Sequence, residues 1–393
     1  MVDYLEVSSE KNRDNRFTKE DVLSVSGEYG IVNQIEFQGR SFAGASVSNY
    51  GVVENGDVVY TKSPLKSNPY GIIKTNKGIP GIVSTLYAVY KPKEITDSKF
   101  VQIYFELDSR MNSYMRPLVN KGAKNDMKVS AENALKGMVS FPKKDEQEMI
   151  SLYFSTLDNL ITLHQQKITL LTKLKKTMLE KMFPKKGSLI PEIRFNGFAN
   201  AWEQRKVLDL LIQPITDGPH ETPKLVEEGV PFISVDAIVD NKIDFNRKRG
   251  NISEEYDELC CKKYKPQFHD VYLVKSGSTV GKVAIVETTD RFNIWSPLAA
   301  MRCGEKTYPY FLYDLLQTKD LQAQVADKAS NGTQPNLSMR ELEKFPVSVP
   351  SNLEEQKKIG DYFRNLDHLI TLHQRKIDKI KNMKKAMLDQ MFI

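Results

Sequence analysis

The side chains in this sequence that could do chemistry lie in short loops, and none of those loops completes a known catalytic motif. The stretch GSTVGKV at 277–283 is similar to a phosphate-binding loop, but it has one residue too few between its glycines. Val283 also stands where such a loop needs a serine or threonine to bind magnesium. The stretch SNPYG at 67–71 lacks the second proline of the loop used by DNA amino-methyltransferases, and no glycine-rich cofactor loop precedes it. We therefore expect a turn there and no nucleotide site at 277–283.

The histidines and cysteines do not show the spacing of metal ligands or of an activated nucleophile. No HExxH pair, no G-x-S-x-G elbow and no CxxC pair occurs. We expect no metal site, no catalytic residue and no disulfide framework, which fits a reducing compartment. The residues considered are His164, His220, His269, His368, His373, Cys260, Cys261 and Cys303.

Several loops instead have the composition of a DNA-binding surface. Lysines neutralise phosphates, and small polar side chains let backbone amides approach a duplex. Glutamine and asparagine can pair with an adenine edge, as NGTQPNLS at 331–338 would allow. An ordinary surface loop is the alternative in each case. The predicted DNA-binding residues are Lys62, Ser63, Lys66, Lys124, Asn125, His220, Thr222, Lys224, Lys275, Ser276, Ser278, Thr279, Gln334 and Asn336.

The elements that position these loops are repeated along the chain. LDNLITLHQ at 157–165 returns as LDHLITLHQ at 366–374, and a shift of 209 positions aligns 146–183 with 355–392. Of these 38 aligned positions, 21 are identical, which indicates a duplication. In both copies the apolar residues step by threes and fours, which predicts two long helices at 145–183 and 354–392. Each helix buries its apolar stripe most simply against the other, so we expect an antiparallel coiled coil within the chain.

The segments that precede the two helices are also related, though weakly. GDVVYTKS at 56–63 aligns with HDVYLVKS at 269–276, and both are strand patterns that end in a basic loop. An aromatic helix, a small polar loop and a strand ending in proline, GMVSFP or FPVSVP, follow in each. The predicted fold class is α/β (α+β), with two similar mixed α/β domains separated by the two helices. About twenty residues near the start of the second domain, in IPEIRFNGFANAWEQRKVLDLL, have no counterpart in the first.

Composition is compatible with this interpretation. The 393 residues carry a net charge of +6, with 40% hydrophobic and 27% charged residues, as in a globular protein. The basic balance permits a polyanionic partner without requiring one. No run of 18 apolar residues occurs, and MVDYLEVSSEKNR lacks a signal-peptide pattern, so we expect a cytoplasmic protein and no membrane partner.

Over essentially its whole length the sequence resembles the specificity (S) subunit of Type I restriction–modification systems. The resemblance rests on the alternation of variable domain and helix. It also rests on EIRFNGFANAWEQRK (192–206), NGTQPNLS, EEQKKIGDYFRNLDHLITLHQRKI (354–377) and the KKxML near both helix ends. It implies target recognition domains at 1–142 and 187–350, the first short at its N-terminus, and conserved helices at 143–186 and 351–393. Each recognition domain would bind one half of a bipartite DNA site.

The resemblance also implies partners. The helices would set the gap between the half-sites and dock two methyltransferase subunits, and restriction subunits would join the complex. Cofactors would be absent from this chain, because S-adenosylmethionine, ATP and magnesium belong to the partner subunits. A free-standing DNA methyltransferase and a coiled-coil adaptor without a DNA role are the alternatives. The predicted partner-binding residues are Leu157, Leu160, His164, Leu366, Leu369 and His373.

Overall fold

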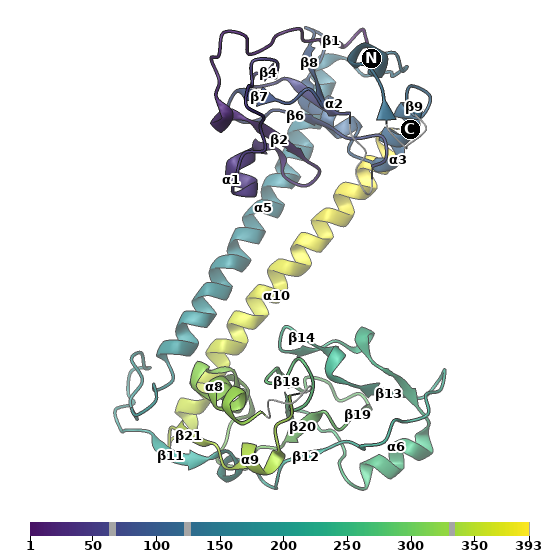
Figure 1. Ribbon diagram of the computed structural model, residues 1–393. Coiled ribbons are helices and arrows are strands. Elements are labelled where there is room, and N and C mark those ends of the chain that lie inside the picture. The colour runs from purple at the N-terminus through teal and green to yellow at the C-terminus, as the bar shows by residue number, and fades with distance from the viewer. Residues whose placement is uncertain (63–67, 122–126, 330–334, 393) are drawn as a thin grey trace. The chain divides into compact units, whose positions relative to one another are not determined.

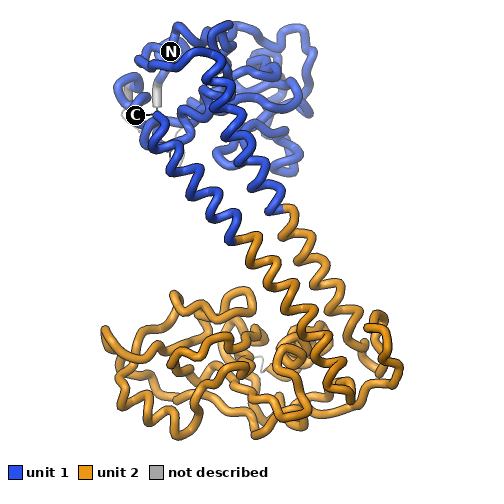
Figure 2. The backbone as a smooth tube through the Cα atoms, turned by 180° about the vertical axis from the view of Figure 1, so that it is seen from behind, with its two compact units in different colours: residues 1–165, 375–393 blue, residues 166–374 orange. Residues whose placement is uncertain are grey.

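The computed structural model describes residues 1–62, 68–121, 127–329 and 335–392. The chain divides into two compact units, which Figure 2 shows in different colours. Unit 1 comprises Met1–Gln165 and Arg375–Ile393, and unit 2 comprises Gln166–Gln374. Each unit contains its own sheets and one part of each long helix.

The two long helices are α5 (Lys144–Lys181) and α10 (Leu353–Gln390), each of 38 residues (Figure 1). In unit 1, Leu157 of α5 is buried against Leu388 of α10. Early residues of α5 therefore meet late residues of α10. In unit 2 the order is reversed, because Lys175, late in α5, contacts Asp367 near the middle of α10. The predicted antiparallel pair is confirmed in both units.

Unit 1 is built on a four-stranded antiparallel sheet with strand order β1-β8-β5-β6. Smaller two-stranded sheets and short helices flank it. Its elements are β1 (Leu5–Val7), β2 (Leu23–Ser26), β3 (Gly30–Asn33), α1 (Gln34–Gln38), β4 (Gly51–Val53), β5 (Val58–Thr61), β6 (Ile73–Thr75), β7 (Gly81–Val83), β8 (Tyr87–Pro92), α2 (Ser98–Tyr104), α3 (Asp108–Met115), β9 (Asn120–Lys121), β10 (Met127–Lys128) and α4 (Ala131–Ala134).

Unit 2 contains a four-stranded antiparallel sheet of order β12-β20-β17-β18 and a three-stranded sheet of order β16-β13-β19. Its elements are β11 (Glu203–Lys206), β12 (Thr216–Asp217), β13 (Val230–Ile233), β14 (Ile238–Val239), β15 (Lys242–Ile243), β16 (Gly250–Ile252), α6 (Glu254–Cys261), β17 (Val271–Val274), β18 (Val283–Ile285), β19 (Asn293–Ile294), β20 (Leu298–Met301), α7 (Pro309–Gln317), α8 (Lys319–Lys328), α9 (Met339–Glu343) and β21 (Pro346–Val349).

The two four-stranded sheets are copies of one arrangement. In each, the first strand and the central strand lie on either side of the last, and the third strand lies at the far edge. The turn that leads into the central strand is repeated as well. Asp57 accepts a hydrogen bond from the Glu54 amide at 2.9 Å, and Asp270 accepts one from the Gln267 amide at 2.8 Å. The predicted duplication of the domain is therefore confirmed in its central sheet.

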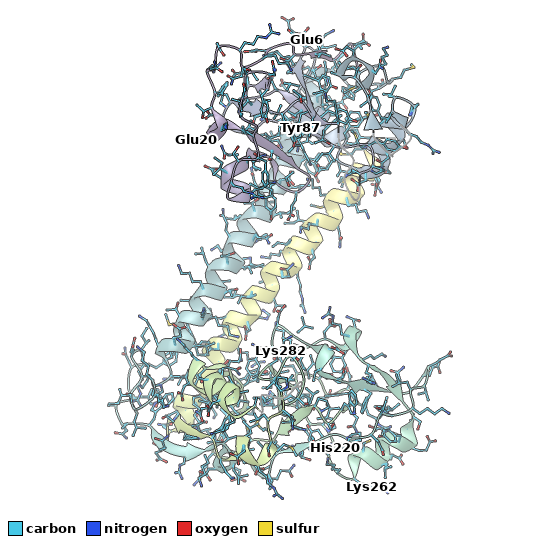
Figure 3. The ribbon with its side chains drawn as sticks, in the orientation of Figure 1. Glu6, Glu20, Tyr87, His220, Lys262 and Lys282 are labelled. Atoms are coloured by element: carbon cyan, nitrogen blue, oxygen red, sulfur yellow. The ribbon has the colours of Figure 1, made fainter. Side chains whose placement is uncertain are left out.

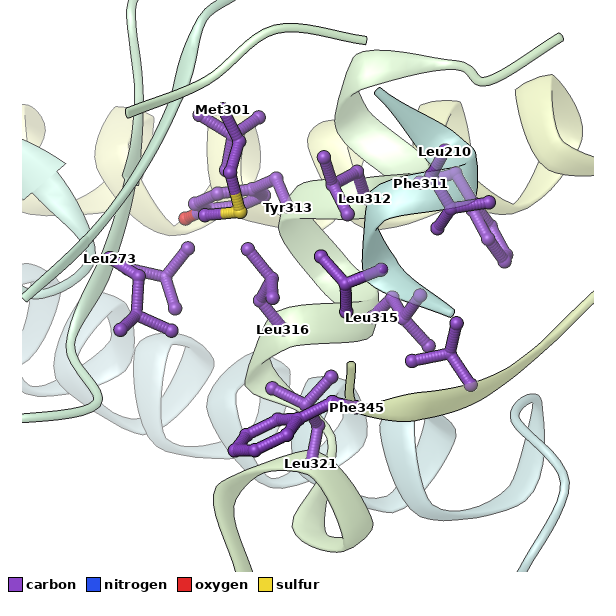
Figure 4. Close-up of a cluster of buried hydrophobic side chains, with 14 of the residues drawn as sticks. Leu210, Leu273, Met301, Phe311, Leu312, Tyr313, Leu315, Leu316, Leu321 and Phe345 are labelled. Carbon is purple, nitrogen blue, oxygen red and sulfur yellow. The ribbon is translucent and has the colours of Figure 1, made fainter. Parts of the chain in front are cut away.

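Each unit buries its own core. In unit 2 the aromatic helix α7 packs on the sheet, and Figure 4 shows Phe311, Leu312 and Leu316 among the side chains of strands and neighbouring helices. In unit 1, Phe100 and Val101 of α2 are fully buried in the corresponding place. Apolar burial of this kind contributes about 25 cal/mol per Å² removed from water. The aromatic helices predicted at 99–107 and 308–316 are confirmed.

One predicted strand is wrong. FPVSVP forms β21, but 137–142 (GMVSFP) forms no strand. The physical reason is the missing partner. β21 pairs with β11, and no described segment of unit 1 takes the place of β11 beside 138–140. The four predicted domain boundaries stay a prediction. No helix within the described residues is long and apolar enough to cross a membrane.

Candidate nucleic-acid interface

Three segments that were predicted separately to bind DNA lie together in unit 2: the loop 216–224, the loop after β17 and the segment before α9. Asn336 forms an antiparallel bridge with Ser276, and the Leu337 amide donates to the Lys275 carbonyl at 2.7 Å. These bonds join the loop after β17 to the segment before α9. The Lys275 amide donates to Pro297 at 2.8 Å, and the Ser296 amide donates to Pro219 at 3.1 Å. The loop at 216–224 is thereby fixed to the same place through residues 295–297.

Asp217 is the electrostatic centre of this loop cluster. Its carboxylate is fully buried at the end of β12, with Lys263 in contact with Oδ1. Lys275 Nζ and His220 Nε2 each lie 3.3 Å from Oδ2, although neither completes a hydrogen bond to it. Lys275 is itself buried, whereas the His220 side chain is 72% exposed (Figure 3). One buried carboxylate therefore holds three potential cations at the loop cluster and balances part of their charge.

An aromatic–cation pair lies beside the cluster and was not foreseen from the sequence. The Arg249 guanidinium lies 4.1 Å from the ring centroid of Trp295. The Trp295 indole donates to the Glu221 carbonyl at 3.2 Å, which ties the pair to the 216–224 loop. Arg249 is exposed, and a planar guanidinium suits phosphate or base contacts. Tryptophan occurs only twice in the chain, which is the one sequence signal that could have singled it out.

Gly218 allows the 216–224 loop to pass close to the backbone of Ile294 in strand β19. A Cβ at this position would lie 1.8 Å from the Ile294 carbonyl oxygen. A side chain of any size would therefore push the loop away from the strand β19. Further along this loop, Thr222 and Lys224 are exposed.

The other predicted residues of the β17 loop differ in accessibility. Ser278 is exposed and Ser276 is half-buried, as is Thr279. The Thr279 hydroxyl is buried without a hydrogen-bond partner among the described residues. It lines a pocket of about 380 Å³ together with Lys282 and Arg247. Asn336 is exposed, so its side chain is accessible while its backbone is held by Ser276.

In unit 1, Lys62 takes the position that Lys275 takes in unit 2. It follows β5 directly, and its amide donates to the Leu86 carbonyl at 2.9 Å, as the Lys275 amide donates to Pro297. Burial lowers the pKa of Lys62, and nearby Lys11 adds to this effect. The predicted residues Ser63, Lys66, Lys124, Asn125 and, in unit 2, Gln334 lie outside the described residues. Their roles stay predictions.

A lysine-rich cleft of about 810 Å³ in unit 1 was also missed. It lies between β6, α5 and α10, elements that are far apart in the sequence. Burial lowers the pKa values of Lys74 and Lys77. An anionic partner would therefore stabilise the charged forms of these lysines. Its lining lysines are Lys74, Lys77, Lys381, Lys384 and Lys385.

The predicted partner-binding leucines fall into two groups. Leu157 and Leu366 are 5% and 6% exposed, so their side chains are buried in the cores of units 1 and 2 and are not accessible to a partner. Leu160 and Leu369 are each 39% exposed and remain accessible. Leu163 and Leu372, at 50% and 37% exposure, extend these two patches and were missed. His164 and His373 are half-buried at equivalent positions.

Residues 202–382 match the family model described as the Type I restriction modification DNA specificity domain. These residues of the second half of the chain therefore carry a domain of the Type I specificity-subunit family. The Type I restriction enzyme MjaVIII specificity subunit of Methanocaldococcus jannaschii is 25% identical over 345 residues, covering 82% of this chain and 75% of that protein. The MjaIX specificity subunit of the same organism is 22% identical, covering 86% of this chain and 74% of that protein.

Solved structures share the fold of this chain. The Type I restriction–modification S subunit from M. genitalium superposes with a TM-score of 0.61 at 14% identity, covering 100% of this chain and 94% of that one. A chain from a structural study of complex assembly and conformational transition in the type I R-M system gives a TM-score of 0.52 at 16% identity, covering 98% and 94%. Among the described residues, no group of His, Cys, Asp and Glu side chains could hold a metal ion.

Proposed function

We propose that each unit of this specificity subunit recognises one half of a bipartite DNA site. The observation that carries the proposal is the duplicated sheet, in which the central strand of each unit is followed directly by an equivalent lysine, Lys62 or Lys275. Two copies of one recognition element suit a site with two halves. Because the loop sequences of the copies differ, the two halves need not be the same.

The loop cluster of unit 2 contains both kinds of group that DNA recognition requires. Lys224 and Arg249 are exposed cations suited to phosphates, which position a protein on a duplex. Asn336 is an exposed amide on a backbone held by hydrogen bonds, which suits a base edge. Gln334, two residues earlier, has the same side-chain chemistry.

The helix pair would set the gap between the half-sites and dock two methyltransferase subunits. Its support is the repetition of exposed leucines, Leu160 with Leu163 and Leu369 with Leu372, at positions 209 residues apart. Equivalent apolar patches suit two copies of one partner. Restriction subunits would complete the assembly.

The chemistry would belong to the partners. S-adenosylmethionine would be bound by the methyltransferase subunits, and ATP with magnesium would serve cleavage in the restriction subunits. This chain would be non-catalytic and would supply sequence recognition. Purified chain incubated with DNA, S-adenosylmethionine, ATP and magnesium should neither methylate nor cut. Activity of the chain alone would favour a free-standing methyltransferase instead.

Insertion of seven residues into both helices tests the function of the helix pair. A heptad preserves the apolar stripe, so the pair should still form. In assembled complexes the methylated bases should stay the same while the gap between them changes. Altered bases with an unchanged gap would refute the proposal. A chain that failed to bind any duplex in a salt-dependent way would point to an adaptor without a DNA role.

A further inference from the structure

The lysine-rich cleft of unit 1 differs in its side chains from the corresponding place in unit 2, although the elements that form it are repeated. Lys74 of β6 pairs with Val59 of β5. Ala284 of β18 pairs in the same way with Tyr272 of β17, the residue that aligns with Val59. Ala284 is 1% exposed, so unit 2 buries a methyl group where unit 1 carries an ammonium group.

In unit 2 an aromatic side chain and a hairpin fill this place. Tyr313 of α7 is 4% exposed, and its hydroxyl donates to the carbonyl of Asn241 at 2.9 Å. Asn241 is the turn residue between β14 and β15, and its side-chain amide donates to Gln317 at 2.8 Å. The Val283 amide lies 3.4 Å from the Asn241 side-chain oxygen. The hairpin β14–β15 is therefore held against α7 and β18.

In unit 1 the same place stays open. Counted from the residues that cap the two aromatic helices, Asp97 and Tyr308, Gln102 corresponds to Tyr313. The shorter Gln102 side chain accepts a hydrogen bond from the Thr75 amide at 3.0 Å and leaves the space of a ring unfilled. Among the described residues, no hydrogen bond joins the hairpin tip at 27–31 to β6, α2 or the long helices. A cleft of about 810 Å³ results.

The charge of the cleft is unbalanced towards lysine. Five lysines and three carboxylates line it. Two of the carboxylates, Glu106 and Asp158, are both bound by Lys384, with each oxygen at 2.7 Å from Nζ. Three residues after Lys74 and Ala284, unit 1 has Lys77 where unit 2 has Glu287. The positive charge is therefore a property of unit 1 and not of the repeated elements as such.

The remaining lysines are arranged to receive more than one anionic group. Lys74 is half-buried, its burial lowers its pKa, and no described carboxylate forms an ion pair with it. Lys381 and Lys385 are exposed on α10 and lie one turn apart, about 6 Å along the helix axis. A row of cations around an elongated opening suits successive phosphates of a nucleic-acid strand better than one small anion.

The cleft also adjoins the predicted recognition loop of unit 1. The Thr61 amide, at the end of β5, donates to the Ile72 carbonyl at 3.0 Å, and Lys74 lies two residues further along, about 7 Å of strand. Unit 2 shows the same neighbourhood, because Thr279 of its β17 loop and Asp240 of its hairpin line one pocket. A duplex that contacts the loop after Lys62 is therefore near the cleft.

We propose that this cleft binds DNA backbone phosphates beside the half-site of unit 1, through Lys74, Lys77, Lys381 and Lys385. The proposal rests on the half-site recognition proposed above and adds a contact that reads no bases. Lys384 holds the helix pair in place instead, because both of its carboxylate partners belong to the cleft wall. Unit 2 has Ala284 and Glu287 at two of these positions, so the two half-sites are held with unequal electrostatic strength.

The test compares two double variants of α10 in assembled complexes. Lys381→Gln with Lys385→Gln removes two exposed cations of the cleft. Lys376→Gln with Lys379→Gln removes two exposed cations from the opposite side of the same helix and is the matched control. The cleft variant should lower the slope of log affinity against log salt by roughly two, because each phosphate contact contributes about 0.9. The control should keep the native slope, and both should methylate the native positions.

A second measurement uses the unmodified complex and does not depend on the folding of a variant. Neutral methylphosphonate linkages are placed one at a time along the duplex. They should weaken binding at consecutive phosphates beside the half-site that Asn336→Ala leaves unchanged, and less at the matching phosphates beside the other half-site. In the cleft variant these linkages should lose their effect.

A native salt slope in the cleft variant, or equal effects of the linkages beside both half-sites, would overturn the phosphate site and leave the proposed half-site recognition standing. Unchanged DNA binding with weaker assembly would identify an acidic segment of a partner subunit as the occupant. Slower hydrogen exchange around Lys74 with inorganic phosphate but not with duplex would identify a free anion. Both results contradict the proposal. A lower slope without any half-site effect of Asn336→Ala would support the phosphate contact and contradict only the proposed half-site recognition.

Discussion

Lys384 Nζ lies 2.7 Å from Asp158 Oδ1, and a shift of 209 residues converts this ion pair into the one between Lys175 and Asp367, also 2.7 Å. The lysine belongs to α10 in the first pair and to α5 in the second. Such reciprocity requires an antiparallel arrangement of two equivalent helices. Both lysines are nearly buried, with side chains 12% and 13% exposed, so these pairs contribute to register more than ordinary surface pairs do.

Cysteine crosslinking tests this register directly. Asp158→Cys with Lys384→Cys should react with a short bifunctional thiol reagent, because the two positions face each other in unit 1. Asp158→Cys with Asp367→Cys is the control, since a parallel pair would bring those two positions together. A chain with Cys260, Cys261 and Cys303 replaced by serine removes background reaction. Crosslinking of the control pair alone would exclude the antiparallel arrangement.

Gln147 and Gln356 should matter for stability to a similar extent. Each is buried at the start of a long helix and accepts a hydrogen bond from the residue that caps the aromatic helix, Asp97 at 2.9 Å or Tyr308 at 3.0 Å. Each also donates to a proline carbonyl, Pro142 or Pro350. Because alanine leaves buried polar groups unsatisfied, either substitution should cost roughly 1–3 kcal/mol in urea unfolding. The exposed Gln213→Ala should cost almost nothing, and equal effects would contradict this account.

Asp314→Asn should stabilise unit 2 at neutral pH. Burial raises the pKa of Asp314 well above its ordinary value, with Lys175 opposing and Asp367 reinforcing the shift. Neither carboxyl oxygen has a hydrogen-bond partner among the described residues. The folded chain therefore holds the proton of Asp314 more tightly than the unfolded chain does. The stability that this proton contributes is complete below the pKa of Asp314 in the unfolded chain and is lost as the pH rises through its pKa in the folded chain.

The measurement is the urea midpoint of Asp314→Asn and of the native chain between about pH 4 and neutral pH. The gain from the asparagine should be smallest near pH 4 and should grow towards neutral pH. Asp327→Asn, at a carboxylate 73% exposed, should show no such trend. A gain that does not change with pH would show that Asp314 is ionised in the folded chain.

Lys275→Ala should weaken binding of the assembled complex to all DNA sequences and reduce the salt slope by about one. Because Lys275 is buried beside Asp217, the same change also removes a cation from a buried carboxylate. Lys275→Arg separates these effects, since it keeps the charge. Lys319→Ala, an exposed change on α8, is the control. If Lys275→Ala lowers stability while the slope stays constant, Lys275 has a structural role and not a phosphate-binding one.

The sequence predicted the elements whose signal is local or repeated. The two long helices follow from uninterrupted apolar stripes, and β5 and β17 follow from matching strand patterns before a basic loop. The buried role of Gln147 and Gln356 was missed because both lie among charged residues at a helix start, a setting typical of exposed positions. Their identity in the two copies was the available signal.

Features that depend on contacts between distant segments could not be predicted. Residues 137–142 have the pattern of a strand but form none, because a strand needs a partner and β11 has no described counterpart in unit 1. Asp217 attracts Lys263 and Lys275 across 46 and 58 positions of sequence, which no spacing rule reveals. The repeated turn is disguised for a different reason. Gly56 has φ 91° and His269 has φ 71°, so a conformation that favours glycine is held by histidine in the second copy.

The most direct test of the central claim is to map the methylated positions in DNA from cells that carry assembled complexes with Gln334→Ala or Asn336→Ala. Each variant should relax recognition of one half-site by roughly 1–3 kcal/mol, because each removes an amide suited to a base edge. The other half-site and the gap should not change, because unit 1 and the helix pair are intact. Methylation of an unaltered bipartite site in both variants would contradict the account.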